Sequence, residues 1–118
     1  MHRLSELKVY RTALVLTKVV RRLTRSFPKE ELFILTAQFR RAVDSIALNV
    51  AEGAGNTSNK EFVRFLTYAI RSGFECLGCL DIALENNFIT ASTHSTTTYS
   101  VTEIIAMLHA LQHHLNIS

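Results

Sequence analysis

The stretch of sequence that decides the fold runs from Phe27 to Gly53 and reads FPKEELFILTAQFRRAVDSIALNVAEG. Pro28 suits the first turn of a helix, where its missing N–H costs nothing, and two glutamates follow at the positive end of the helix dipole. Apolar residues then recur at steps of three and four, which indicates one buried helical face: Leu32, Leu35, Phe39, Ala42, Ile46 and Val50. Because glycine commonly ends helices, Gly53 completes the prediction of a helix from about residue 28 to residue 52.

The residues before this stretch predict another amphipathic helix, from about residue 4 to residue 25. Its apolar residues have the spacing of a bundle helix: Val9, Ala13, Leu16, Val20, Leu23 and Phe27. The opposite face is basic and includes Lys8, Arg11, Lys18, Arg22 and Arg25, with Arg21 beside them. This stripe has two interpretations. It is a face that is solvated or paired with acidic groups from elsewhere, or it is a surface that contacts phosphates. The residues favour neither interpretation.

After the central stretch, a further helix is predicted over residues 59–85. Ser58 and Glu61 have the spacing of a capping box at its start. Its apolar face is wide and includes Phe62, Phe65, Leu66, Ala69, Gly73, Cys76, Leu77, Leu80 and Leu84, while Lys60, Arg64, Thr67 and Arg71 form a second outward stripe. Cys76 and Cys79 have C-x-x-C spacing but lie in mid-helix, so we interpret them as small buried side chains rather than a redox pair or a zinc site.

The last helix is predicted over about residues 92–116, but its start is poorly defined because residues 90–100 are rich in Ser and Thr. Its core residues are Val101, Ile104, Ile105, Leu108, Leu111 and Leu115. His109 and His113 are four residues apart, a spacing that can bind a metal, but the H-E-x-x-H pattern is missing. A solvated or oligomer-facing surface is the favoured interpretation, and no metal or cofactor is predicted.

Composition and turn length define the predicted architecture. The chain has 118 residues, 47% of them hydrophobic, with only 4 Gly and 1 Pro. We therefore expect one domain over residues 1–118, and short turns indicate antiparallel neighbours. The prediction is all-α, an antiparallel up-down-up-down four-helix bundle. The apolar segments are too interrupted by charge for a membrane span, and the first residues lack the apolar run of a signal peptide, so we expect a cytoplasmic protein.

Charge is distributed unevenly along the chain. All 13 Lys and Arg residues lie at or before Arg71, together with six of the 10 acidic residues, which gives residues 1–72 a net charge of +7. The remaining four acidic residues, Glu75, Asp81, Glu85 and Glu103, give residues 73–118 a net charge of −4. This asymmetry indicates either a polyanionic partner or head-to-tail contact between subunits.

Polar residues on the central helix are predicted to be structural. Arg40 lies at the flank of the apolar face, and Arg41 lies three residues before Asp44, a spacing that predicts a surface ion pair. Asn49 lies at the edge of the core, where an unpaired amide would be costly. We favour a structural hydrogen bond that fixes helix register, because a catalytic role for Asn49 would need a nucleophile that the sequence does not supply.

The central stretch also carries a family resemblance. It is similar to the signature of the four-helix-bundle proteins encoded in 23S rRNA intervening sequences, also labelled S23, at Phe27, Pro28, Glu30, Leu35, Gln38, Arg40, Arg41, Ala42, Ser45, Ile46, Asn49, Val50, Ala51, Glu52 and Gly53. The similarity covers roughly residues 7–89. One departure is Arg71, where the family usually has glycine. The resemblance implies an rRNA-linked context and a homo-oligomer, since these proteins and the similar accessory proteins of diversity-generating retroelements form pentameric rings, and the latter bind RNA and a reverse transcriptase.

These observations lead to two functional hypotheses. No Glu has a His three residues later, which argues against a di-iron bundle, and no nucleophile elbow is present, so we do not expect an enzyme. The leading hypothesis is RNA binding through phosphate contacts by the basic residues named above, with little base recognition because few exposed aromatic residues are evident. The alternative is an interaction scaffold whose basic face meets another subunit or an acidic protein.

Overall fold

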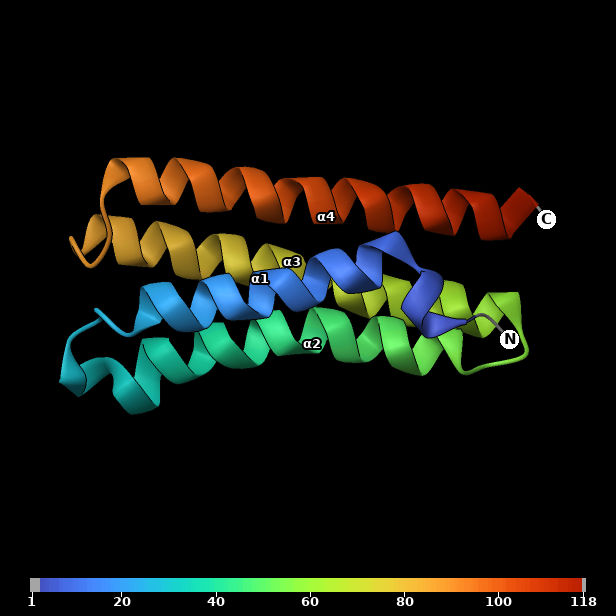
Figure 1. Ribbon diagram of the computed structural model, residues 1–118, viewed down its shortest axis with the longest axis horizontal. Coiled ribbons are helices and arrows are strands. Elements are labelled where there is room, and N and C mark those ends of the chain that lie inside the picture. The colour runs from blue at the N-terminus through green and yellow to red at the C-terminus, as the bar shows by residue number, and fades with distance from the viewer. Residues whose placement is uncertain (1–2, 118) are drawn as a thin grey trace.

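The computed structural model describes residues 3–117. Within these residues, all regular secondary structure is helical, and short turns join the helices. Four long helices form a bundle: α1 (Lys8–Thr24), α2 (Ala37–Ala54), α3 (Asn59–Glu85) and α4 (Ala91–Ile117). Successive helices run in opposite directions along the long axis (Figure 1). The all-α prediction and the four-helix bundle are confirmed. The predicted domain also takes in residues 1, 2 and 118, which lie outside the described residues.

The predicted apolar faces of α1 and α2 form the centre of the core. Val9, Ala13, Leu16 and Val20 of α1 are all buried, as are the α2 residues Phe39, Ala42, Ile46 and Val50. α2 packs mainly on α3, and α3 on α4, whereas α1 has fewer contacts with α4. Each helix therefore buries one stripe, and removal of those apolar side chains from water is the main stabilising contribution.

The entries to α1 and α2 differ from the predicted continuous helices. A short 3-10 helix (Leu4–Glu6) precedes α1 and is separated from it by Leu7 in an extended conformation. Before α2, Pro28 is also extended and is followed by a 3-10 helix (Lys29–Glu31) and a π-helix (Leu32–Thr36). Because 3-10 and π turns contain fewer and more residues than α turns, they rotate the side chains before α2 out of the α2 stripe.

Leu32 shows the consequence of this changed geometry. The sequence places it in the core stripe, but its side chain is 47% exposed, while Leu35 at the end of the same segment is buried. Phe33 and Ile34 are 89% and 65% exposed. The prediction that Leu32 belongs to the core was therefore wrong, because it assumed an unbroken α-helical period.

The sequence predicts that Gly53 ends α2, but the structure shows that it does not. The helix continues to Ala54, and Gly55 is its C-terminal cap. Gly53 is instead buried against α3, where an added Cβ would lie 2.8 Å from Cδ1 of Phe62 and 2.9 Å from Cβ of Phe65. The glycine is needed because it lets two helices approach closely, not because the chain turns there.

We expect Gly53→Ala to lower the free energy of unfolding by about 1–3 kcal/mol, because the new methyl group meets Phe65 Cβ, which cannot move without its backbone. Gly78→Ala is the matched control: Gly78 lies inside α3, and its added Cβ would meet nothing within 4 Å. This control should raise stability by about 0.5–1 kcal/mol. Denaturant unfolding followed by circular dichroism measures both, and equal effects of the two substitutions would contradict the packing role of Gly53.

The two helices of the second half have well-defined ends. α3 has the predicted bounds, and Ser58 Oγ caps it by accepting from the backbone N–H of Glu61 at 3.3 Å. At its C-terminal end, Asn87 adopts a φ of 62°, and the N–H of Phe88 donates to the Ala83 carbonyl at 2.8 Å. These are the features of a Schellman motif, in which Asn replaces the usual Gly.

α4 begins at Ala91 and ends at Ile117, one residue beyond the predicted range at each end. Its first half is helical although Ser and Thr are poor helix formers: Thr90 Oγ1 caps the helix by accepting from the Thr93 N–H at 3.1 Å, and the Thr97 hydroxyl is satisfied by donating to the Thr93 carbonyl at 2.8 Å. Thr97 itself is buried. Low intrinsic helix propensity is thus offset by capping and by tertiary packing.

Candidate functional site

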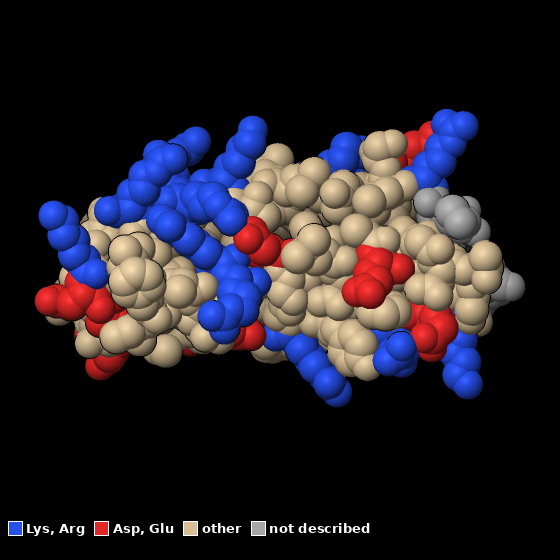
Figure 2. Space-filling view, turned by 90° about the horizontal axis from the view of Figure 1, so that it is seen from below, with Lys and Arg blue, Asp and Glu red and all other residues tan. Residues whose placement is uncertain are grey.

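The predicted basic residues of the first helix all lie on the surface of the bundle. Lys8, Arg11, Lys18, Arg21, Arg22 and Arg25 are exposed. Figure 2 shows Lys and Arg side chains gathered towards one end of the face that it displays, whereas basic and acidic side chains are mixed towards the other end. We call the cations at the C-terminal end of α1 and directly after it the basic corner: Lys18, Arg21, Arg22, Arg25 and Lys29.

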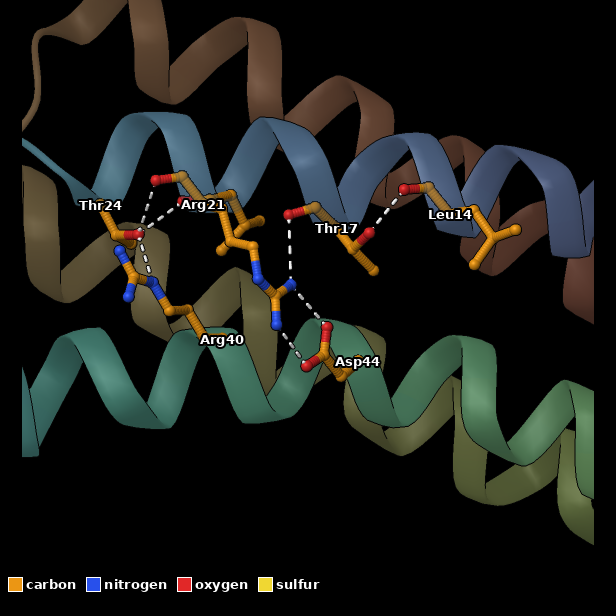
Figure 3. A network of polar contacts seen from close by, with 7 residues as sticks. Leu14, Thr17, Arg21, Thr24, Arg40 and Asp44 are labelled. Atoms are coloured by element: carbon orange, nitrogen blue, oxygen red, sulfur yellow. Dashed lines mark hydrogen bonds and ion pairs between the residues drawn. The ribbon is translucent and has the colours of Figure 1, made fainter.

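Arg21 is engaged in a structural ion pair. Its guanidinium donates to both carboxylate oxygens of Asp44 on α2, at 2.8 and 2.7 Å, which joins α1 to α2 (Figure 3). The hydrogen bond from Arg21 to Asp44 raises the pKa of Arg21. The predicted pair between Arg41 and Asp44 was wrong, because the neighbouring antiparallel helix presents a guanidinium to Asp44 with both amino groups in reach.

Arg40 also has a structural role, at the end of α1. Its side chain is half-buried, and its Nε donates to Thr24 Oγ1 at 2.9 Å. The Thr24 hydroxyl in turn donates to the Val20 carbonyl at 2.7 Å (Figure 3). Arg11 makes a comparable contact at the other end of α1, where it donates to the Ser5 carbonyl at 2.9 Å and holds the short 3-10 helix.

The other basic residues predicted on the first two helices have no protein partner of this kind among the described residues. Among the described residues, the structure gives no ion pair or side-chain hydrogen bond to Lys8, Lys18, Arg22, Arg25 or Arg41. Lys18 and Arg22 lie four residues apart on the exposed surface of α1, and Arg25 follows at its C-terminal cap. Like charges at this spacing repel one another weakly, so an anion that binds across them relieves a repulsion.

The basic stripe on α3 has a different environment. Arg64 forms an ion pair with Glu61 at 2.8 Å, donates to the Tyr68 hydroxyl at 2.8 Å and lies over the Phe65 ring. The hydrogen bonding from Arg64 to Glu61 lowers the pKa of Glu61 and raises the pKa of Arg64. Arg71 lies 5.9 Å from the centre of the Tyr68 ring, and Lys60 is exposed.

The two predicted stripes do not form one surface. α1 and α3 each pack on α2 and α4, so they lie across the bundle from each other (Figure 1). Outward side chains on α1 and α3 therefore face different directions. Of the predicted phosphate-contacting residues, the structure brings together those of the basic corner and separates Lys60, Arg64 and Arg71 from them.

The polar signature residues join α2 to α3. Asn49 donates to the Ser45 carbonyl at 2.9 Å and to Ser45 Oγ at 3.0 Å, and the Ser72 hydroxyl of α3 donates to Ser45 Oγ at 2.9 Å. Gln38 donates to the carboxylate of Glu75, also on α3. The interhelical link from Asn49 therefore runs through Ser45, while Glu52 is exposed on the surface of α2.

The cysteine and histidine residues that the sequence singled out lie apart from the basic corner. Cys76 and Cys79 are free and buried, and burial raises their pKa values to about 12 and about 11, so both thiols stay protonated at neutral pH. His109 and His113 are exposed. Within residues 3–117, no group of three or more His, Cys, Asp and Glu side chains is arranged to hold a metal ion.

Exposed apolar side chains are a feature that the sequence interpretation missed. They are Leu14, Val15, Leu32, Phe33, Ile34, Leu48, Phe74, Ile82 and Tyr99. Phe33, Ile34 and Ile82 line a groove of about 420 Å³ together with Gln38 and Arg41. The run of four apolar residues from Leu32 to Leu35 was the available signal, since one amphipathic helix cannot bury four consecutive side chains. Three aromatic side chains, Phe33, Phe74 and Tyr99, are each more than half exposed, and they lie on three different helical segments.

None of the described helices is long and apolar enough to cross a bilayer.

Comparisons with known proteins identify the family. No curated protein matches the chain. A solved structure from Bacteroides thetaiotaomicron, a protein with unknown function from the S23 ribosomal protein family, has the same fold, with a TM-score of 0.82, 21% identity and coverage of 88% of this chain and 97% of that one. The model of the 23S rRNA-intervening sequence protein family matches residues 5–110, and this chain therefore belongs to that family.

Proposed function

We propose that this protein is a cytoplasmic, non-enzymatic RNA-binding protein that acts as a homo-oligomer and contacts RNA phosphates through the basic corner. The observation that carries the proposal is the row of exposed cations without protein partners, Lys18, Arg22 and Arg25, continued by Lys29 in the 3-10 helix before α2. Cations already paired with carboxylates would have to exchange one partner for another, whereas these are free to neutralise phosphates and release counterions.

The family adds the choice of polyanion. Its description refers to an intervening sequence of 23S rRNA, which favours RNA over other polyanions as the partner. The corner presents most of its charges along one exposed helix face, which suits contact with phosphates more than with base edges. Binding of this kind follows the backbone of a structured RNA and has little sequence preference.

A salt titration tests the proposal. If four cations of the corner contact phosphates of an RNA duplex, a plot of log affinity against log salt concentration should have a slope of about −3.6, from about −0.9 per contact. Fluorescence anisotropy with a labelled structured rRNA fragment measures the slope, with protein mass determined in the same buffers. Failure of an intact protein to bind RNA at low salt would contradict the proposal.

The exposed apolar residues favour a second role for part of the surface. Isolated exposed apolar side chains are ordinary, but a groove lined by Phe33, Ile34 and Ile82 is typical of a protein contact. Acidic residues of α3 and α4, such as Glu85 and Glu103, are also exposed and can meet a basic partner. We therefore propose that apolar surfaces join subunits, in a pentamer if the family resemblance holds, and that a scaffold whose basic corner meets protein is the alternative to RNA binding.

A further inference from the structure

A small pocket of about 210 Å³ lies at the turn between α1 and α2, within the basic corner. Its polar lining consists of Arg25, Lys29, Arg40, Thr24 and Thr36, and the rest of the lining is apolar. No acidic residue lines the pocket, although Glu30 and Glu31 lie on the adjacent 3-10 helix. Three positive charges around one concavity, with no carboxylate among them, indicate an anion as the ligand.

Arg40 is held in place for such a ligand. Its Nε donates to Thr24 Oγ1 at 2.9 Å, and the buried Thr24 hydroxyl is itself fixed by its bond to the Val20 carbonyl (Figure 3). The structure gives the two terminal amino groups of Arg40 no hydrogen bond to any described residue. A guanidinium with a fixed plane and free N–H donors matches the oxygens of a phosphate, and holding it in advance reduces the entropy lost on binding.

Thr36 supplies an independent observation. Its side chain is only 2% exposed and lines the pocket, yet the structure gives its hydroxyl no hydrogen bond among the described residues. Thr36 is also the last residue of the π-helix, a type of turn that is frequent at functional sites. The Thr36 hydroxyl can therefore donate to, or accept from, a ligand in the pocket without giving up a protein partner.

The C-terminal end of α1 lies near the pocket, and the negative end of its helix dipole would repel an anion. The carbonyls of residues 22–24, however, accept hydrogen bonds from the backbone N–H groups of residues 25–27 at 3.1–3.4 Å. These bonds engage the partial negative charges that would otherwise face the turn. The side-chain charges of Arg25, Lys29 and Arg40 therefore dominate the local field.

We propose that this pocket binds a terminal phosphate monoester. The volume is below the 300 Å³ or more that is usual for a whole drug-sized ligand, so it suits one small group of a larger molecule. A monoester carries close to two negative charges and three terminal oxygens, which match three cations better than the single negative charge of a phosphodiester. The source is either the phosphorylated end of an RNA strand, which rests on the proposed RNA-binding function, or a small phosphorylated molecule, which does not.

The test compares two short structured RNAs that differ only in a 5′-phosphate or a 5′-hydroxyl, together with inorganic phosphate and a nucleoside monophosphate. The phosphorylated RNA should bind about tenfold more tightly, in keeping with one additional charge-assisted contact. Inorganic phosphate should shift the amide NMR signals of Thr36 and Arg40. Arg40→Gln should remove the preference for the phosphorylated end, and Thr36→Val, which keeps charge and shape, should reduce it about threefold.

Arg71→Gln is the control, because it removes the same charge from α3, across the bundle from the pocket. It should keep the full preference for the phosphorylated end, and melting temperatures should show that every variant is folded. Equal binding of both RNAs, with no signal shifted by phosphate, would overturn the pocket even if RNA binding persists. Shifts at the pocket with phosphate and nucleoside monophosphate, but no binding of either RNA, would support the pocket and contradict the proposed RNA-binding function.

Discussion

Leu16→Asp is expected to abolish the folded state. Leu16 lies in the middle of α1 and its side chain is only 2% exposed. Loss of a buried leucine side chain alone costs about 2–5 kcal/mol, and an unpaired carboxylate in the core adds several more. Since a domain of this size is stable by only about 5–15 kcal/mol, the substitution removes most or all of the free energy of unfolding.

Val15→Asp is the matched control, because it introduces the same carboxylate one residue earlier on the same helix. Val15 is 61% exposed, so its substitution should leave the circular dichroism spectrum unchanged and lower stability by less than about 1 kcal/mol. Far-ultraviolet circular dichroism and thermal unfolding measure both variants. A folded Leu16→Asp protein would show that the assignment of α1 faces is wrong, and an unfolded Val15→Asp protein would show that this surface is covered in an assembly.

The helices were predictable where the local pattern and the global fold agree. The apolar period gives the buried stripe of α1, and Ser58 and Asn87 mark the ends of α3 by capping chemistry that depends on near neighbours. The same local rules failed at Leu32, because no sequence pattern indicates a π-helix. They also failed at Gly53, whose role is set by Phe62 and Phe65 on another helix.

The candidate site was predictable only in part, for a related reason. The sequence identifies the basic residues but not their partners, and those partners come from other helices. Asp44 binds Arg21, which lies 23 residues away, rather than Arg41 three residues before it. Arg40 was expected on a basic flank, but its bond to Thr24 fixes it beside a pocket that exists only once α1 and α2 pack together.

The double substitution Lys18→Glu with Arg22→Glu is expected to abolish RNA binding while the protein stays folded. Both residues are exposed on the outward face of α1 and lie four positions apart. The two lost phosphate contacts account for about 1.8 of the expected salt slope of about −3.6, and the two new carboxylates repel RNA as well. A glutamate near the C-terminal end of α1 opposes the helix dipole, which costs about 0.3–1 kcal/mol, too little to unfold the domain.

Lys60→Glu with Arg71→Glu makes the same change in net charge on α3 and serves as the control. If the basic corner contacts RNA, the α1 pair should lose binding, the α3 pair should keep most of it, and both should retain the mass of the native protein by light scattering. If the corner is instead a seam between subunits, the α1 pair should fall to a smaller mass. α1 and α3 lie on opposite sides of the bundle and cannot contact one duplex through the same surface. Equal loss of binding in both double variants would therefore mean that net charge alone attracts RNA.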